Sequence, residues 1–107
     1  MIDWFQRAED ATDFLTKTDE KLAELKVKHE RDKRKAKNIW SAIFLRVEGN
    51  IEERKAQAEG HPEYQTAQAA EMTSLLEYEK VRNRRDTADT VIEFWRSYNS
   101  AKTKGMI

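Results

Sequence analysis

The chain contains no cysteine, one proline and three glycines among its 107 residues. Without cysteine it cannot form a disulfide framework or a thiolate metal site. One proline and three glycines supply too few turn residues for a fold of many β-strands. No apolar run approaches the ~18 residues that a membrane-spanning helix needs. Because 37% of the residues are charged, these absences favour a highly charged, soluble helical protein.

Residue patterns that carry out catalysis are equally sparse. The two histidines, His29 and His61, fall on different predicted elements, and neither long segment has the Glu-x-x-His pair of a helical di-iron site. No serine has a histidine nearby, and no glycine-rich phosphate loop is present. We therefore expect a protein that is not an enzyme and that uses no metal or cofactor. The first four residues lack the features of a secretory signal, which predicts a cytoplasmic location.

Apolar residues recur along two long segments that contain no glycine or proline. In each segment the step alternates between three and four residues, which is the 3.5-residue period of helices packed as a coiled coil. The first seam consists of Trp4, Ala8, Ala11, Leu15, Thr18, Leu22, Leu25, His29, Asp32, Ala36, Ile39 and Ile43. The second consists of Tyr78, Val81, Arg85, Ala88, Ile92 and Trp95, with Ala67, Met72 and Leu75 close to it.

The residues between the two segments predict a short helix. Asn50 followed by Glu53 is a capping box, Gly60 suits the position after the helix, and Pro62 fits the first turn of the next one. We predict one all-α domain over 1–107, with a long helix at about 3–48, a short helix at about 51–59 and a long helix at about 63–103. The long helices are expected to form an antiparallel hairpin, because their connection is short.

The register of that hairpin follows from placing Glu48 opposite Glu63. Lys26 then faces Arg85, and His29 faces Arg82. A hairpin of two helices has a thin core, so we expect a homo-oligomer that covers the remaining apolar surface through coiled-coil-like packing. The predicted oligomer interface consists of Trp4, Leu15, Leu22, Leu25, Ile39, Ile43, Val81, Ile92 and Trp95. The alternative is that the short helix covers the tip of a monomer.

A net charge of zero conceals strong blocks of charge. Residues 26–37 carry net +5 and residues 80–85 carry net +4, while 1–25 and 48–79 are acidic. The predicted register brings both basic blocks to one height, where they would form a belt for an anionic ligand. Alternatively, the charges form solvated ladders within each helix, such as Glu30 with Arg34 and Arg82 with Asp86.

Two aromatic residues accompany the first basic block. Trp40 and Phe44 have helical spacing, and base faces can stack on rings that are interleaved with basic residues. Aromatics at this spacing are more often part of the core. We assign Phe44 to the core and leave the role of Trp40 open.

The stretch VEGNIEERKAQAEGHPEYQTAQAA and the later stretch YEKVRNRRDTADTVIEFWRSYNSAKTKG resemble the UvsY-like recombination mediators of tailed bacteriophages. The resemblance covers roughly residues 36–105. It implies a small all-helical protein that assembles into rings, binds single-stranded DNA and helps to load a recombinase onto strands coated by a single-strand binding protein. Residues that match the family's basic and aromatic helix in kind are Lys35, Lys37, Trp40 and Arg46.

The sequence departs from that family pattern at 41–45, which carries no charge. The expected DNA contact therefore shifts toward the basic belt. The candidate nucleic-acid-binding residues are Lys33, Arg34, Lys35, Lys37, Trp40, Arg46, Arg82, Arg84 and Arg85. The acidic segment 48–63 is expected to contact the recombinase or the single-strand binding protein. The alternative function is a non-enzymatic helical adaptor, chaperone or inhibitor that binds proteins and no nucleic acid.

Overall fold

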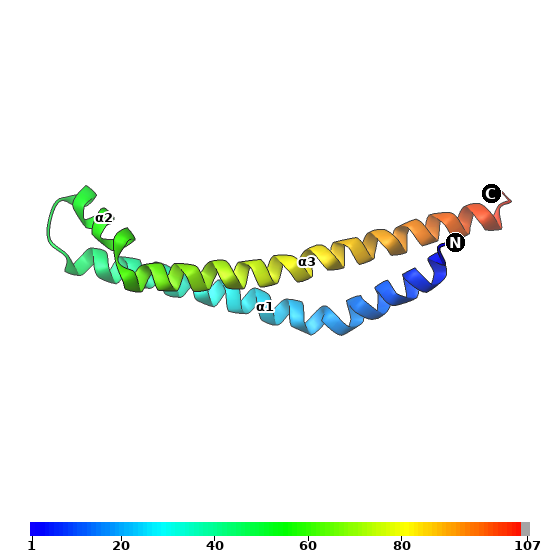
Figure 1. Ribbon diagram of the computed structural model, residues 1–107, viewed down its shortest axis with the longest axis horizontal. Helices are drawn as coiled ribbons and strands as arrows, with labels where there is room; N and C mark the ends of the chain where they lie inside the picture. Colours follow the sequence, from blue (N-terminus) through cyan, green and yellow to red (C-terminus); the bar gives the residue numbers. More distant parts are fainter. Residues whose placement is uncertain (106–107) are drawn as a thin grey trace. The chain divides into compact units, whose positions relative to one another are not determined.

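The computed structural model describes residues 1–105 and consists of three α-helices (Figure 1). They are α1 (Trp4–Arg46), α2 (Ile51–Gly60) and α3 (Pro62–Thr103). Over the described residues there is no strand, so the predicted all-α class is confirmed. Each helix begins and ends within two residues of its predicted bounds. The last two residues of the predicted domain, 106–107, lie outside the described residues.

The corner between α1 and α2 has the predicted cap. Asn50 Oδ1 accepts a hydrogen bond of 2.9 Å from the Glu53 backbone N–H, and Asn50 Nδ2 donates one of 2.9 Å to Glu53 Oε1. Gly49 just before it has φ +124°, and a Cβ atom there would lie 2.6 Å from Glu53 Oε2. Only glycine adopts this conformation without strain, so Gly49 allows the turn that starts α2.

The corner between α2 and α3 differs from the prediction for Gly60. Gly60 is the last residue of α2 and is not left-handed, and the chain leaves the helix at His61, with φ −71° and ψ 131°. The reason is Pro62, because a residue before proline is restricted to extended backbone. Pro62 begins α3 and Glu63 lies in its first turn, as predicted.

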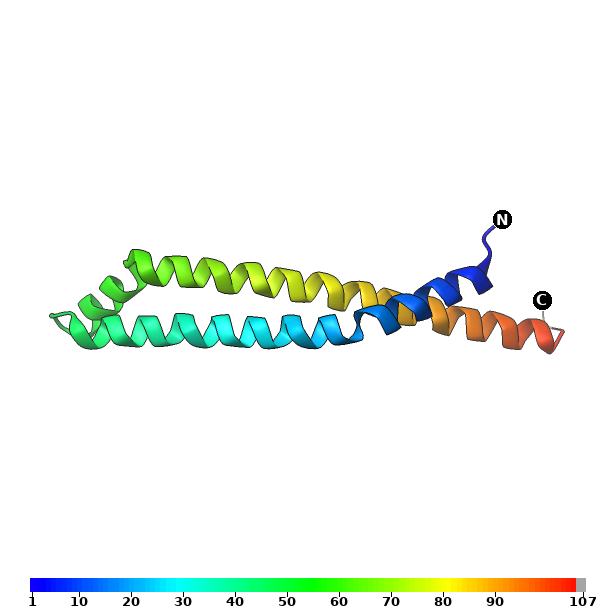
Figure 2. The ribbon, with the colours of Figure 1, turned by 90° about the horizontal axis from the view of Figure 1, so that it is seen from below.

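The chain folds into two compact units, and both long helices contribute to each. The first unit, which we call the end unit, combines Met1–Ala23 of the α1 side with the described part of Glu79–Ile107. The second, the corner unit, comprises Glu24–Tyr78 and includes α2, which appears in green in Figures 1 and 2. In Figure 2, the blue segment of α1 and the orange segment of α3 cross within the end unit.

The predicted seam of α1 is the least exposed stripe of that helix. Every seam position is buried or half-buried, including Ala8 and Ala11 in the end unit and Ala36 and Ile43 in the corner unit. On α3, Glu71 and Ser74 continue the seam, and of the two residues predicted to lie close to it there, Leu75 is half-buried and Met72 is 57% exposed. Among the described residues, the buried apolar side chains are six alanines and Ile43, so the core is thin.

The register differs from the prediction by about two helical turns. Arg85 contacts Thr18 and Asp19 in the place of Lys26, and His29 Nε2 lies 3.8 Å from Glu71 Oε1 in the place of Arg82. The predicted register would have set like charges against each other, whereas the observed one gives Arg85 hydrogen-bond acceptors on α1 and brings a carboxylate near His29, whose Nε2 forms no hydrogen bond within residues 1–105. At the tip, Arg46 lies beside His61, so α3 begins level with the end of α1.

The aromatic contacts of the first turn of α1 show the same shift in register between α1 and α3. Trp4 contacts Phe94 with ring centroids 4.3 Å apart, and Phe5 contacts Trp95 at 5.7 Å. The register with Glu48 opposite Glu63 would instead have placed Phe94 and Trp95 opposite Leu15. Phe5 and Phe94 remain 54% and 46% exposed, so the end unit keeps aromatic surface in contact with solvent.

Candidate nucleic-acid interface

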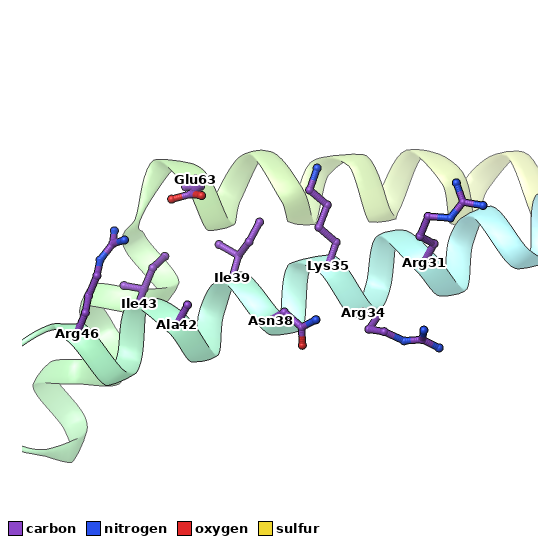
Figure 3. Close-up of a pocket in the computed structure, with 9 residues that line it drawn as sticks. All are labelled: Arg31, Arg34, Lys35, Asn38, Ile39, Ala42, Ile43, Arg46 and Glu63. Carbon is purple, nitrogen blue, oxygen red and sulfur yellow. The ribbon is translucent and has the colours of Figure 1, made fainter.

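One side of α1 in the corner unit forms a basic groove of about 530 Å³ (Figure 3). The helical repeat of 3.6 residues brings positions 31, 34, 35, 38, 42 and 46 to this side. Arg31, Arg34, Lys35 and Arg46 supply four cations, and Ile39, Ala42 and Ile43 provide apolar surface. Asn38 and one carboxylate, Glu63 from the first turn of α3, complete the lining.

The cations of the groove are spread along the helix. Arg31 and Arg46 are fifteen positions apart, which corresponds to about 22 Å of helix. Figure 3 shows Arg31 and Lys35 extending toward α3, whereas Arg34 points away from it. A ligand that touches all four cations is therefore a long anion, because the positive charge follows the groove without converging on a point.

The groove cations have no carboxylate partner among residues 1–105. Arg31, Arg34 and Lys35 are exposed and form no ion pair within 4.0 Å over that range. The ladder predicted between Glu30 and Arg34 is thus not formed. Arg46 Nη2 lies 3.2 Å from His61 Nε2, so its neighbour is an imidazole ring and not a carboxylate. These cations keep their charge available for an anion from outside the chain.

Three other predicted contact residues lie on a different side of α1. Helical spacing puts Lys33, Lys37 and Trp40 across the seam from the groove. The Trp40 ring stacks on Phe44, with centroids 5.2 Å apart and planes 10° from parallel. The Arg54 guanidinium lies 4.4 Å from the Phe44 ring, and Arg54 Nε donates a hydrogen bond of 2.9 Å to the Phe44 carbonyl. Phe44 is half-buried between these groups, and Trp40 keeps one ring face that Phe44 does not cover.

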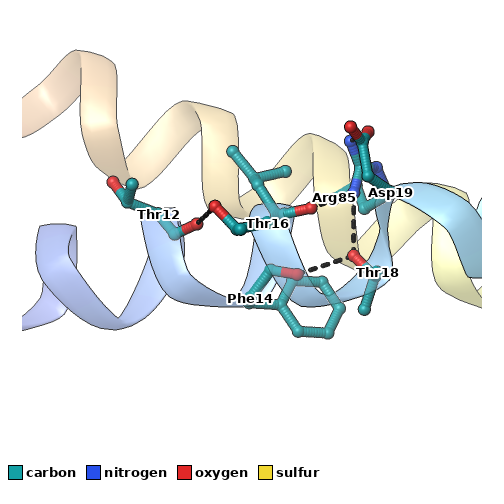
Figure 4. Close-up of polar contacts among 7 residues, drawn as sticks. Thr12, Phe14, Thr16, Thr18, Asp19 and Arg85 are labelled. Carbon is teal, nitrogen blue, oxygen red and sulfur yellow. Dashed lines mark hydrogen bonds and ion pairs between the residues drawn. The ribbon is translucent and has the colours of Figure 1, made fainter.

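The second basic block belongs to the end unit, so the predicted belt is divided between the two units. Arg82 Nη1 lies 3.5 Å from Glu79 Oε1, and Arg84 is exposed. Arg85 is engaged inside the unit (Figure 4). Its Nη1 donates to the Leu15 carbonyl at 2.7 Å and to Thr18 Oγ1 at 2.8 Å, and its Nη2 pairs with Asp19 Oδ1 at 2.9 Å.

These bonds give Arg85 a role within the fold. Its side chain is only 16% exposed, so the guanidinium has little surface to offer a phosphate. We therefore leave Arg85 out of the binding surface, although the sequence analysis had placed it there. The sequence also overlooked Arg31 and Glu63 as groove residues. Arg31 had a detectable signal, because it lies three and four positions before Arg34 and Lys35 on the same helix.

The predicted oligomer-interface residues pack within the chain. Ile43 is 1% exposed, and Trp4 and Trp95 contact Phe94 and Phe5. The remaining predicted interface residues are half-buried: Leu15, Leu22, Leu25, Ile39, Val81 and Ile92.

Within residues 1–105, no group of three or more histidine, cysteine, aspartate or glutamate side chains is suited to a metal ion. None of the helices, over the described residues, carries a segment with both the length and the hydropathy of a membrane span. Comparison with protein-family models, curated proteins and solved structures finds no significant match to the chain.

Proposed function

We propose that this protein binds single-stranded DNA without strong sequence preference, through the basic groove of the corner unit. The observation that carries the proposal is the row of four cations, of which Arg31, Arg34 and Lys35 form no ion pair within the described chain. Lysine and arginine side chains bind nucleic acid by displacing counterions from its phosphates. A single strand is flexible enough to follow the groove along about 22 Å of helix.

The biological role that we propose is that of a phage recombination mediator in the bacterial cytoplasm. Its support is the resemblance of residues 36–105 to UvsY-like proteins, together with an all-helical fold and a groove suited to phosphates. In this role the protein would assist a recombinase at strands coated by a single-strand binding protein. The acidic, exposed side chains of α2, such as Glu52 and Glu59, are the surface that we assign to these protein partners.

We further propose that the long helices form an antiparallel hairpin and that the chain works as a homo-oligomer with coiled-coil-like contacts. The thin core supports this proposal, because six alanines and Ile43 bury little apolar area for a chain of this length. Exposed aromatic surface supports it as well. Phe5, Phe94 and Tyr98 are 54%, 46% and 39% exposed in the end unit, and clustered exposed apolar residues mark interfaces.

Fluorescence anisotropy of a labelled single-stranded oligonucleotide, titrated at several salt concentrations, tests DNA binding. Replacing Arg31, Arg34 and Lys35 together by glutamine should weaken binding and reduce the salt slope by about 0.7 for each lost phosphate contact. The matched control replaces Lys17, Lys55 and Arg96, which are cations paired within their own helices. Equal losses for both triple variants, or no binding by the natural sequence at low salt with the oligomer intact, would contradict the proposal.

A second candidate function is a helical adaptor, chaperone or inhibitor that binds proteins alone. Exposed apolar side chains in the corner unit favour it, since Leu45 and Ile51 are 75% and 60% exposed beside the α1–α2 corner and Met72 is 57% exposed. Under this alternative, charge reversal at Arg31, Arg34 and Lys35 leaves partner binding intact. Under the DNA-binding proposal the same change abolishes the anisotropy signal.

A further inference from the structure

A second cavity adjoins the basic groove within the corner unit. This recess has a volume of about 320 Å³ and lies between α1 and α3. It shares Lys35, Ile39 and Glu63 with the groove. Its other walls are Asp32 from α1 and Thr66, Ala67 and Ala70 from α3. The space exists because two of the α3 side chains that face it are single methyl groups.

The polar chemistry of the recess is opposite to that of the groove. The groove has four cations and one carboxylate, whereas the recess has two carboxylates, Asp32 and Glu63, the Thr66 hydroxyl and one cation, Lys35. Over residues 1–105, neither carboxylate forms an ion pair within 4.0 Å. A phosphate is therefore attracted to the groove and repelled by the recess, while a group with N–H donors is attracted to the recess.

A nucleotide carries both kinds of group, an anion for the groove and N–H donors for the recess. Its phosphate is anionic, and cytosine, adenine and guanine carry an exocyclic amine that donates hydrogen bonds to carboxylates, as glutamate and aspartate do toward cytosine in DNA recognition. Thymine has no such amine, and its single ring N–H lies between two carbonyl oxygens, so a carboxylate that accepts from the N–H is repelled by the oxygens beside it. A volume of 320 Å³ equals the share of roughly ten water molecules in the liquid, which is enough for a planar base.

We propose that the recess takes one base of the bound strand and favours bases with an exocyclic amine over thymine. The phosphates then lie along Arg31 and Arg34, and the base turns toward α3, where Asp32 or Glu63 accepts from its amine. This inference rests on the proposed DNA binding and adds a base preference to it. Glu63 and Asp32 are thus specificity-determining residues, and the groove arginines supply the binding that is common to all sequences.

The test is fluorescence anisotropy with labelled homopolymers of deoxycytidine, deoxyadenosine and deoxythymidine of equal length, at neutral pH and one salt concentration. The natural sequence should bind the cytidine and adenosine strands about fivefold more tightly than the thymidine strand. Exchanging both carboxylates, Asp32→Asn with Glu63→Gln, should bring the affinities for the three strands to near equality. Glu9→Gln with Asp89→Asn, which removes the same two negative charges at exposed positions of the end unit, should leave the preference unchanged.

Filling the recess gives an independent check that preserves both carboxylates. Ala70→Leu places a larger side chain at an exposed position of α3 and should remove the base preference while the salt slope stays the same. Circular dichroism establishes that each variant keeps its helices. An unchanged preference in both Ala70→Leu and the carboxylate variant would overturn the proposal.

The outcomes separate this inference from the function on which it rests. Equal, salt-sensitive binding of all three strands by the natural sequence overturns the base preference and leaves DNA binding in place. Absence of binding to every strand at low salt overturns the proposed function itself. Competition by polyglutamate that is as strong as competition by DNA would assign the groove to acidic peptides, and it too would overturn the nucleotide proposal.

Discussion

Replacing Arg85 with methionine tests whether this side chain serves the fold or DNA. Methionine keeps much of the apolar stem and removes the guanidinium, which donates to the Leu15 carbonyl, to Thr18 Oγ1 and to Asp19 Oδ1 at 2.7, 2.8 and 2.9 Å. These bonds join α3 to α1 within the end unit. We expect the variant to lower the free energy of unfolding and to leave affinity for single-stranded DNA nearly unchanged.

The size of the effect follows from the surroundings of each acceptor. The two bonds from the charged guanidinium to neutral oxygens contribute about 1.5–3 kcal/mol each. The pair with Asp19 adds about 0–1 kcal/mol, because the Asp19 side chain is 76% exposed and its charge is well solvated. Thr18 Oγ1 also donates to the Phe14 carbonyl at 2.7 Å, so its hydroxyl keeps a partner in the variant. We therefore expect the free energy of unfolding to fall by at least about 3 kcal/mol.

Urea unfolding monitored by circular dichroism measures this loss. Arg84→Met is the matched control, because Arg84 is the adjacent arginine and is exposed, and its replacement should stay within about 0.5 kcal/mol. Asp19→Asn should cost less than about 1 kcal/mol. If Arg85→Met and Arg84→Met have the same stability, the buried hydrogen bonds do not hold the two helices together. A stable Arg85→Met variant with reduced DNA affinity would restore Arg85 to the binding surface.

The core, the cap of α2 and the exposed aromatic residues can each be tested by substitution. Ile43→Ala should lower the free energy of unfolding in urea by about 2–5 kcal/mol. Leu45→Ala, at a 75% exposed position, should lower it by less than about 0.5 kcal/mol. Similar values for the two variants would refute the assignment of the core. Asn50→Ala should lower the free energy of unfolding by about 0.5–2 kcal/mol, and Asn50→Gly by only a few tenths of a kcal/mol. An Asn50→Ala variant as stable as the natural sequence would show that the cap of α2 contributes nothing. Phe94→Glu should reduce the mass measured by light scattering, and Met72→Glu should not; the reverse result would place self-association on the corner unit.

The helices and the seam were predictable from the sequence because both depend on local patterns. Gly49, Asn50 and Pro62 mark the corners through backbone conformation and capping, which involve residues only a few positions apart. The alternation of three and four residues identifies the buried stripe of a helix whatever its partner is. Gly60 was assigned wrongly because the effect of Pro62 on the residue before it, His61, outweighs the usual glycine ending.

The register could not be derived in this way. Alanines such as Ala8, Ala11, Ala67 and Ala88 are buried in the seam, and one alanine fits against another at many offsets. A seam of small, alike residues therefore discriminates weakly between registers that differ by whole turns. The register is therefore determined by polar seam residues such as Arg85, whose hydrogen-bond partners are more than sixty positions away in the sequence.

The sequence identified the basic blocks, but it did not give their arrangement in space. Counting charges along 26–37 treats the block as one surface, but a helix distributes three turns of residues over all its sides. Lys33 and Lys37 therefore lie across the seam from Arg31, Arg34 and Lys35. Asp32 and Glu63, which form the recess with Thr66, come from helices whose pairing requires the register, and no local pattern reveals them.

The position of a cation relative to the seam decides what it can do in this protein. Arg85 occupies a seam position, so its charge is neutralised by acceptors on the facing helix. Arg31 and Arg34 do not occupy seam positions, and neither forms an ion pair among residues 1–105, so their charge stays available to an outside anion. Trp40 lies on the other side of α1, stacked on Phe44. If DNA binds as we propose, its phosphates lie on the groove arginines and a base in the recess, so the fluorescence of Trp40 should change little on binding.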